Sequence, residues 1–356
     1  MALVKLPPET LIQIFDYVGS SYFRSDLSRL TVCKQWSELA HTACFRDLYV
    51  TQKTLRRLLS SPYVESSLRL VKNSVETLDL NFKGFEDWDS IPLSGHDPQA
   101  VNVWNGAHGH AVRATWTTEL NNDLLYLAPI IQQSRRLRIL RIQATSELHP
   151  LLRLLERRDY LFLSTIRTFL SVSNLTSLEL DLCGTRLIPH QSQDQSQERG
   201  EGIHVCASIA ALLTTLRRLR LRMRSICADV LRPPQHCTDL KLNEMLINLS
   251  LSNESPVTTS AAHATCCSSS TGGFLQLKAD MEKQAQVLVA QMAAPKIVRI
   301  LTHALPRIEM RAFDVLTGRN VALSEGADWD DEGEVIEDQV SDDESEISDL
   351  SSDDDE

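Results

Sequence analysis

The chain has 356 residues, and its eight cysteines and ten histidines are the residues best suited to chemistry. Thiolates and imidazoles bind zinc and act as nucleophiles and bases. The closest sets are His204/Cys206, His236/Cys237 and the adjacent Cys266-Cys267. No C-x-x-C pair or other zinc-type spacing occurs among them. We therefore interpret these pairs as isolated and the cysteines as free thiols of a reducing compartment, and we predict no metal site.

Sequence motifs for calcium binding, phosphate binding and catalysis are incomplete or absent. The run Asp328-x-Asp330-x-Glu332-Gly333 resembles the start of a calcium loop, but position twelve would be Gln339 rather than a bidentate Glu. Neither glycine-rich type of phosphate loop occurs, and no Ser/His/Asp or Cys/His set is recognisable. The sequence therefore predicts a protein that is not an enzyme and needs no cofactor.

Three short apolar helices are predicted within the first fifty residues. In the first, Pro8 and Glu9 suit the first turn, and an apolar face follows at spacings of three and four residues. Asp26 can cap a second helix, and the third begins near Cys33. So small a bundle cannot bury all its apolar side chains, which indicates a partner surface.

Residues 4–48 resemble an F-box. The resemblance rests on Leu6-Pro7-x-Glu9-x-Leu11, Ile14-Phe15, Asp26-Leu27-x-x-Leu30 and Val32-Cys33-Lys34-x-Trp36-x-x-Leu39-Ala40. Seven residues separate Val18 from Asp26, more than is usual, and we interpret them as a loop.

The resemblance implies docking onto a Skp-type adaptor, and through it a cullin, in an SCF-type ubiquitin ligase. The positions that would face the adaptor or shape its surface are Leu6, Pro7, Ile14, Phe15, Leu27, Leu30, Val32 and Trp36. The alternative is an ordinary helical core with no partner.

The motif L-x-x-L-x-L recurs, with conservative replacements, through the middle of the chain. It begins at Val75, Leu137, Leu175, Leu216 and Leu246, and more weakly at Leu305. Helical segments precede several copies, which favours an α/β fold with a parallel sheet. The fold resembles an irregular leucine-rich-repeat solenoid, because single units could not bury their leucines. A non-repetitive α/β domain with leucine-rich strands is the alternative.

Stacked strands would align the residues between the leucines into a ladder on the open face. Its rungs would be Asp79/Asn81, Arg141/Gln143, Glu179/Asp181, Arg220/Arg222, Ser250/Ser252 and Glu309/Arg311. The candidates for substrate contact are Asp79, Arg141, Glu179, Asp181, Arg220 and Arg222. These charges could equally form ion pairs across the strands, and both interpretations can hold together.

The predicted domains are an F-box at 1–50, a substrate-binding domain at 51–323 and a disordered acidic tail at 324–356. Three segments look inserted: 84–118, which holds three tryptophans, and 189–202 and 252–273, which look mobile. The first is either a binding loop or a cap on the flank of the solenoid.

The net charge of −11 is unevenly placed. Residues 320–356 hold 17 acidic and no basic residues, so the rest of the chain is mildly basic. The tail either keeps the chain soluble, attracts a basic partner or folds over the chain's own arginines. Ser341, Ser351 and Ser352 each have an acidic residue three positions later, like casein-kinase-type phosphorylation sites.

No stretch is long and apolar enough for a membrane helix, and no secretory signal is recognisable. We expect a cytoplasmic or nuclear protein with neither membrane nor nucleic-acid partners. The favoured function is a substrate receptor that binds the adaptor through the F-box and an unknown protein through the repeats. The alternatives are an acidic-tailed, leucine-rich-repeat nuclear protein that binds histones or other basic proteins, and an F-box protein acting without a cullin.

Overall fold

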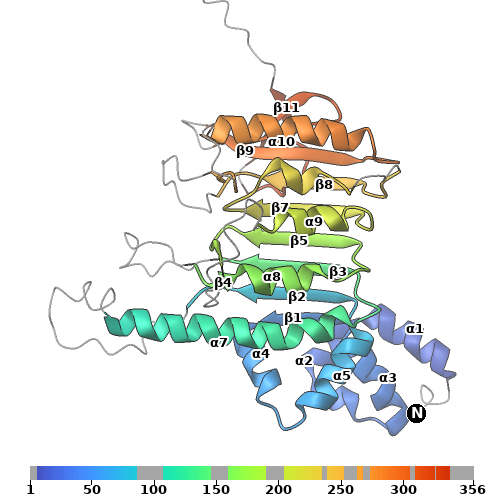
Figure 1. Cartoon of the computed structure of the whole chain (residues 1–356). Helices are drawn as coiled ribbons and strands as arrows, with labels where there is room; N and C mark the ends of the chain where they lie inside the picture. Colours follow the sequence, from blue (N-terminus) through green and yellow to red (C-terminus); the bar gives the residue numbers. More distant parts are fainter. Residues whose placement is uncertain are drawn as a thin grey trace, which may run out of the picture.

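The computed structural model describes residues 6–85, 107–145, 159–189, 204–234, 239–251, 263–267, 273–304, 309–324 and 326–336. Ten strands form one sheet whose order across the sheet follows the order along the chain (Figure 1). The first seven are parallel to one another, and the last three run antiparallel to their neighbours. The parallel strands are β1 (Asp47–Thr51), β2 (Thr77–Phe82), β3 (Ile139–Ala144), β5 (Ser177–Leu182), β7 (Arg218–Met223), β8 (Glu244–Asn248) and β9 (Ile297–Ala304). The others are β10 (Glu309–Asp314), β11 (Arg319–Leu323) and β12 (Glu334–Ile336), with β4 (Leu161–Phe162) and β6 (Leu187–Ile188) in a separate two-stranded sheet.

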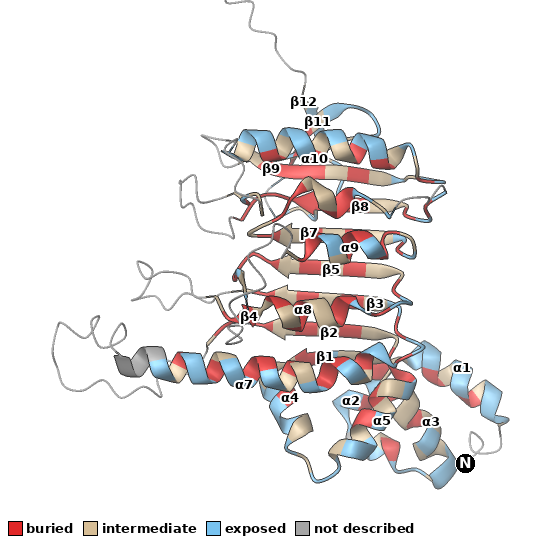
Figure 2. Ribbon diagram, in the orientation of Figure 1, coloured by how far each residue is buried: buried red, intermediate tan, exposed pale blue. Residues whose placement is uncertain are grey.

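Helices cover one face of the large sheet. The four nearest it are α7 (Ala107–Gln132), α8 (Leu163–Leu170), α9 (Cys206–Leu212) and α10 (Gly273–Val289), and buried and exposed residues alternate along them (Figure 2). Beside β1 lie α4 (Gln52–Leu59) and α5 (Val64–Ser74), and the short helix η5 (Ala228–Leu231) packs against α9 and α10. None of the helices in the described ranges has the length and apolar content that a membrane span requires.

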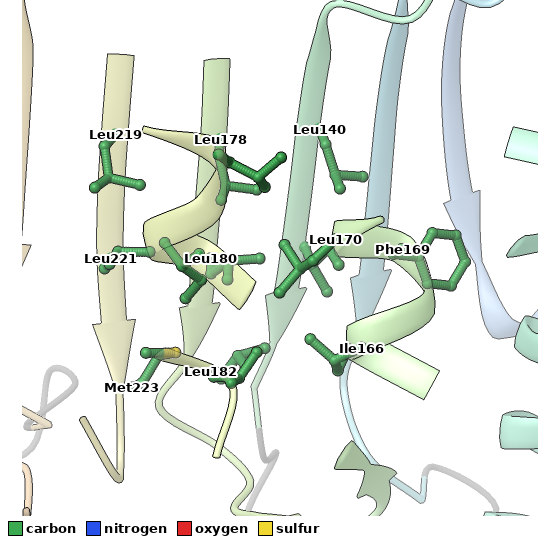
Figure 3. Packing of buried hydrophobic residues seen from close by; sticks show 14 of the residues in the cluster. Leu140, Ile166, Phe169, Leu170, Leu178, Leu180, Leu182, Leu219, Leu221 and Met223 are labelled. Atoms are coloured by element: carbon green, nitrogen blue, oxygen red, sulfur yellow. The ribbon is translucent and has the colours of Figure 1, made fainter. Parts of the chain in front are cut away.

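The core is a ladder of apolar side chains on the helix-covered face. One row joins Leu78, Leu140, Leu178, Leu219, Met245 and Val298 across six strands. These residues are almost completely buried, and helix α8 closes part of the row with Ile166 and Phe169 (Figure 3). Burying one such side chain contributes about 1.5–3 kcal/mol. This burial offsets the conformational entropy lost on ordering the strands only when neighbouring strands stack. The chain is therefore an α/β protein, as predicted.

The predicted strand positions are correct for the four copies that begin at residues 75, 137, 175 and 216, and wrong for the last two. In β8, Met245 and Ile247 point into the core and Leu246 lies on the other face. The inward positions that the motif predicts for Leu249 and Leu251 are therefore occupied by Met245 and Ile247. The next parallel strand is β9, whose inward residues include Val298 and Ile300, whereas residues 309–314 form the antiparallel β10. A search for leucines misses a strand built from valine and isoleucine.

Two of the predicted inserts contain ordered structure. Residues 107–118 of the insert 84–118 begin helix α7, and Trp116 packs edge-on against Phe85 and Tyr160 at ring distances of 5.6 and 5.7 Å. Within 252–273, a segment predicted to be mobile, residues 263–267 form bridges to Ser225 and Ser250. Trp88, Trp104 and almost all of 189–202 lie outside the described residues.

Candidate functional site

The N-terminal helical unit has a small aromatic core of its own. It consists of α1 (Pro8–Val18), α2 (Ser20–Ser25), η2 (Leu27–Leu30) and α3 (Lys34–Cys44). Phe15 is 2% exposed, and its ring meets those of Phe23 and Trp36 edge-on at 5.1 and 4.5 Å. The indole Nε1 of Trp36 donates a hydrogen bond to the carbonyl of Arg29 at 2.6 Å, which ties α3 to η2.

The link between Val18 and Asp26 is a helix rather than the predicted loop. Gly19 adopts a φ of 79°, which ends α1, and α2 then places Phe23 in the aromatic core. Asp26 caps η2 as predicted, because its side chain accepts a hydrogen bond from the backbone of Ser28. The longer link therefore adds apolar contacts to the unit instead of loosening it.

The predicted adaptor residues fall into three groups by exposure. Phe15 and Leu30 are buried in the aromatic core, so they hold the surface together and do not form it. Pro7 and Val32 are exposed, while Leu6, Ile14 and Trp36 are half-buried. The side chain of Leu27 lies outside the described residues.

Sequence reasoning missed further apolar side chains that the helical unit leaves in solvent. Ile12 and Tyr22 are 44% and 43% exposed, Val18 is 36% exposed, and Tyr17 is 93% exposed. Ile12 lies one turn after Pro8, and the two flank the buried face of α1 that carries Leu11 and Phe15. An apolar stripe wider than the buried core requires was the available signal. A helical unit with so much exposed apolar surface is suited to a protein partner.

The helical unit is joined firmly to the sheet. Only two residues separate α3 from β1, so the domain boundary predicted at residue 50 falls inside a strand of the sheet. The guanidinium of Arg46 bridges Asp16 of α1 at 2.7 Å and Glu76, just before β2, at 2.8 Å. Burial opposes the charge of Arg46, but the two carboxylates outweigh it and raise the pKa of the guanidinium. These contacts give the helical unit a defined orientation relative to the sheet.

The face of the sheet opposite the helices carries the predicted charged ladder. The strand register places Arg141 beside both Asp79 and Glu179, and Glu179 beside Arg220. The Arg141 Nε lies 3.3 Å from a Glu179 carboxylate oxygen. We call this surface, from β2 to β9, the charged face. The last two predicted rungs are wrong, because Leu246 and Arg299 occupy the next positions instead of the residues expected at 250–252 and 309–311.

One ion pair on the charged face is largely buried. Arg222 Nε lies 2.8 Å from Asp181 Oδ1, a second guanidinium nitrogen contacts Oδ2, and both side chains are about 15% exposed. At the other end of the face, burial raises the pKa of Asp79, an effect that Arg141 opposes and Glu179 reinforces. The Asp79 Oδ1 is buried and accepts no hydrogen bond from the described residues. Asp79 thus has a carboxylate oxygen on this face that is buried without a hydrogen-bond donor in the described part of the chain.

Part of the predicted disordered tail is ordered and covers the charged face. We call residues 326–332, between β11 and β12, the acidic latch. Trp329 lies 5.3 Å from the guanidinium carbons of both Arg220 and Arg222. Asp328 and Asp330 place carboxylate oxygens 3.7 and 3.5 Å from Arg220. The prediction of disorder from residue 324 onward is therefore wrong for residues 326–336.

The latch is held by more than charge. Trp329 and Ala327 pack on an apolar cluster that includes Leu246 and Leu301. The backbone carbonyl of Asp331 accepts a 2.6 Å hydrogen bond from Arg299. Composition alone indicated disorder because acidic residues dominate, but one tryptophan and the arginines beneath it provide enough contact to order the segment. The phosphorylation candidates Ser341, Ser351 and Ser352 lie outside the described residues.

Comparison with known proteins identifies the helical unit but not the rest of the chain. No curated protein matches the chain at a significant level. The F-box-like family model matches residues 3–51, which covers α1, α2, η2, α3 and β1. The N-terminal unit of this protein is therefore an F-box-like domain, fused directly to the first strand of the sheet.

Proposed function

We propose that this protein is a substrate receptor of an SCF-type cullin–RING ubiquitin ligase and is not itself an enzyme. The observation that carries the proposal is the F-box-like domain at residues 3–51, because such domains generally bind Skp-type adaptors. The adaptor would connect the chain to a cullin. The chain would then act by proximity, raising the effective concentration of substrate lysines near the charged ubiquitin carrier.

The exposed apolar side chains of the helical unit support the adaptor contact. Pro7, Ile12 and Val32 are exposed although each would gain free energy from burial. Phe15 and Trp36 would contribute by keeping the helices in place, with the accessible part of the indole in contact with the adaptor. The ion pairs of Arg46 would then hold the sheet at a fixed angle to the ligase.

The charged face is the proposed substrate surface. Its two ends differ in chemistry: Asp79, Arg141 and Glu179 form an end that the latch leaves uncovered, whereas the latch occupies Arg220 and Arg222. A substrate segment with basic groups would meet the partly exposed side chains of Asp79 and Glu179 at the first end. A segment with acidic and aromatic groups would compete with the latch at the second.

Co-purification with a Skp-type adaptor tests the proposal. Val32→Asp places a charge on an exposed valine of the F-box-like domain, and Val287→Asp does the same at matched exposure on α10 (46% and 47% exposed). We expect the first variant to lose adaptor and the second to retain it, because burying an unpaired carboxylate in an interface is costly. If the wild-type chain recovers no adaptor, or if both variants recover it equally, the proposed adaptor surface is wrong.

The alternative of an acidic-tailed protein that binds histones makes a different prediction. Binding to basic proteins would survive deletion of residues 1–48, and no adaptor would associate with the full chain. Two acidic residues of the latch, Asp328 and Asp330, are engaged with the chain's own Arg220, which favours the receptor over this alternative.

A further inference from the structure

Four side chains that can bind a metal meet beyond the carboxyl ends of β7 and β8, far from the F-box-like domain in the sequence. His204 and Cys206 stand at the start of α9, Cys227 follows β7, and Cys267 follows β8 in the segment 263–267. Their ligand atoms all lie within 4.8 Å of one another. The pair that the sequence presented as isolated is therefore completed by two cysteines from the segments that follow β7 and β8.

Two of the distances within this cluster match those of neighbouring ligands around one ion. The Sγ atoms of Cys206 and Cys267 are 3.7 Å apart, and the Cys227 Sγ is 3.7 Å from the His204 Nδ1. In a tetrahedral zinc site, bond lengths of about 2.3 Å to sulfur and 2.0–2.1 Å to nitrogen place neighbouring ligand atoms about 3.6–3.8 Å apart. A disulfide would need its sulfurs at about 2.05 Å. The observed spacing fits a shared ion and not a disulfide.

The backbone holds these ligands in place without an ion. Thr265 donates to the carbonyl of Arg224 at 2.9 Å, and Ile226 donates to the carbonyl of Thr265 at 3.0 Å. These two bonds fix the segment that carries Cys267 against the segment that carries Cys227. A cavity of about 200 Å³ reaches His204 and Cys267, which provides a route by which an ion can enter.

We propose that His204, Cys206, Cys227 and Cys267 bind one Zn²⁺ ion. Binding would release three thiol protons and give a tetrahedral centre of three thiolates and one imidazole. Four protein ligands leave no open position, so the centre is structural and not catalytic. It would staple α9 and the segment 263–267 to the ends of β7 and β8, and this role does not depend on the proposed ligase function.

The full chain, purified under reducing conditions without chelator, tests this proposal. Elemental analysis should find about one zinc per chain, and X-ray absorption should show a first shell of three sulfurs and one nitrogen. Cys227→Ser should lose the zinc, whereas Cys266→Ser, which changes the neighbour of a ligand but not the cluster itself, should retain it.

The X-ray absorption measurement uses the wild-type chain, so it decides the question even if Cys227→Ser fails to fold. A folded and reduced wild-type chain that takes up no zinc when the ion is supplied would overturn the proposal. The same follows if a folded Cys227→Ser variant binds as much zinc as the wild type, or if mass spectrometry finds Cys206 and Cys267 joined as a disulfide in the freshly isolated chain.

Discussion

The acidic latch should open when Trp329 is replaced by alanine. The indole contacts the guanidinium groups of Arg220 and Arg222 and packs on the apolar cluster around Leu246. Alanine removes all of these contacts. The hydrogen bonds that the Arg299 guanidinium donates to the backbone carbonyls of residues 329 and 331 can remain, so the change weakens the latch without removing every attachment.

The size of the effect follows from these contacts. Two cation–π contacts contribute about 0.5–1 kcal/mol each near a surface. Burial of a large apolar side chain contributes about 1.5–3 kcal/mol when complete, and Trp329 is only half-buried. The total is about 2–3 kcal/mol, which corresponds to an increase of roughly 30- to 150-fold in the equilibrium constant for opening, since 1.4 kcal/mol is a factor of ten.

Hydrogen exchange of the amides in residues 326–336 measures this opening directly. Val335→Ala is the matched control, because this valine lies in the adjoining strand β12 and is 53% exposed. We expect exchange in the latch to accelerate in Trp329→Ala and to stay near the wild-type rate in the control. Equal exchange in the wild type and Trp329→Ala would show that the tryptophan does not hold the latch, and the reasoning about the charged face would fail with it.

Three further changes test other parts of the structure. Phe15→Ala should cost the helical unit about 3–5 kcal/mol, and hydrogen exchange should then accelerate in α1 to α3 while the sheet stays protected. Asp181→Asn should lower the free energy of unfolding in urea by about 2–3 kcal/mol, because it leaves the largely buried Arg222 without its carboxylate. Burial lowers the pKa values of His263 and His303, and the charges of His263 and Arg222 add to the effect at His303. The unfolded chain therefore binds more protons below about pH 6.5, so stability should fall between pH 7 and pH 5, and less so when both histidines are changed to glutamine.

The sequence predicted best what depends on neighbouring residues. The helices of the N-terminal domain followed from local signals: a proline at the first turn, an apolar face and a capping Asp26. The charged rungs from β2 to β7 followed from the alternation of single strands. These inferences needed only a helical or strand period and no knowledge of the partner strand, whereas the F-box itself was indicated by the resemblance of the motif from Leu6 to Ala40 to that family.

The missed features depend on residues that are distant in sequence. The cluster of His204, Cys206, Cys227 and Cys267 spans three connections of the sheet, so no spacing rule for local motifs could find it. The leucine motif did not predict strand β9, because valine and isoleucine occupy its inward positions. Composition correctly marked the tail as acidic, but it carried no information about which arginines lay within reach of Trp329.

The latch also indicates what the proposed substrate surface can bind. Its Asp-Trp-Asp sequence places two carboxylates and an aromatic ring on Arg220 and Arg222, so this end of the charged face already accommodates an acidic and aromatic segment. A substrate that binds there must first displace the latch, and removing the Trp329 contribution of about 2–3 kcal/mol would raise its apparent affinity by up to roughly 30- to 150-fold. A substrate that binds beside Asp79 meets no such barrier. The affinity change caused by Trp329→Ala therefore locates the substrate: tighter binding places it on the arginine end, and unchanged binding places it on the end nearer the F-box-like domain.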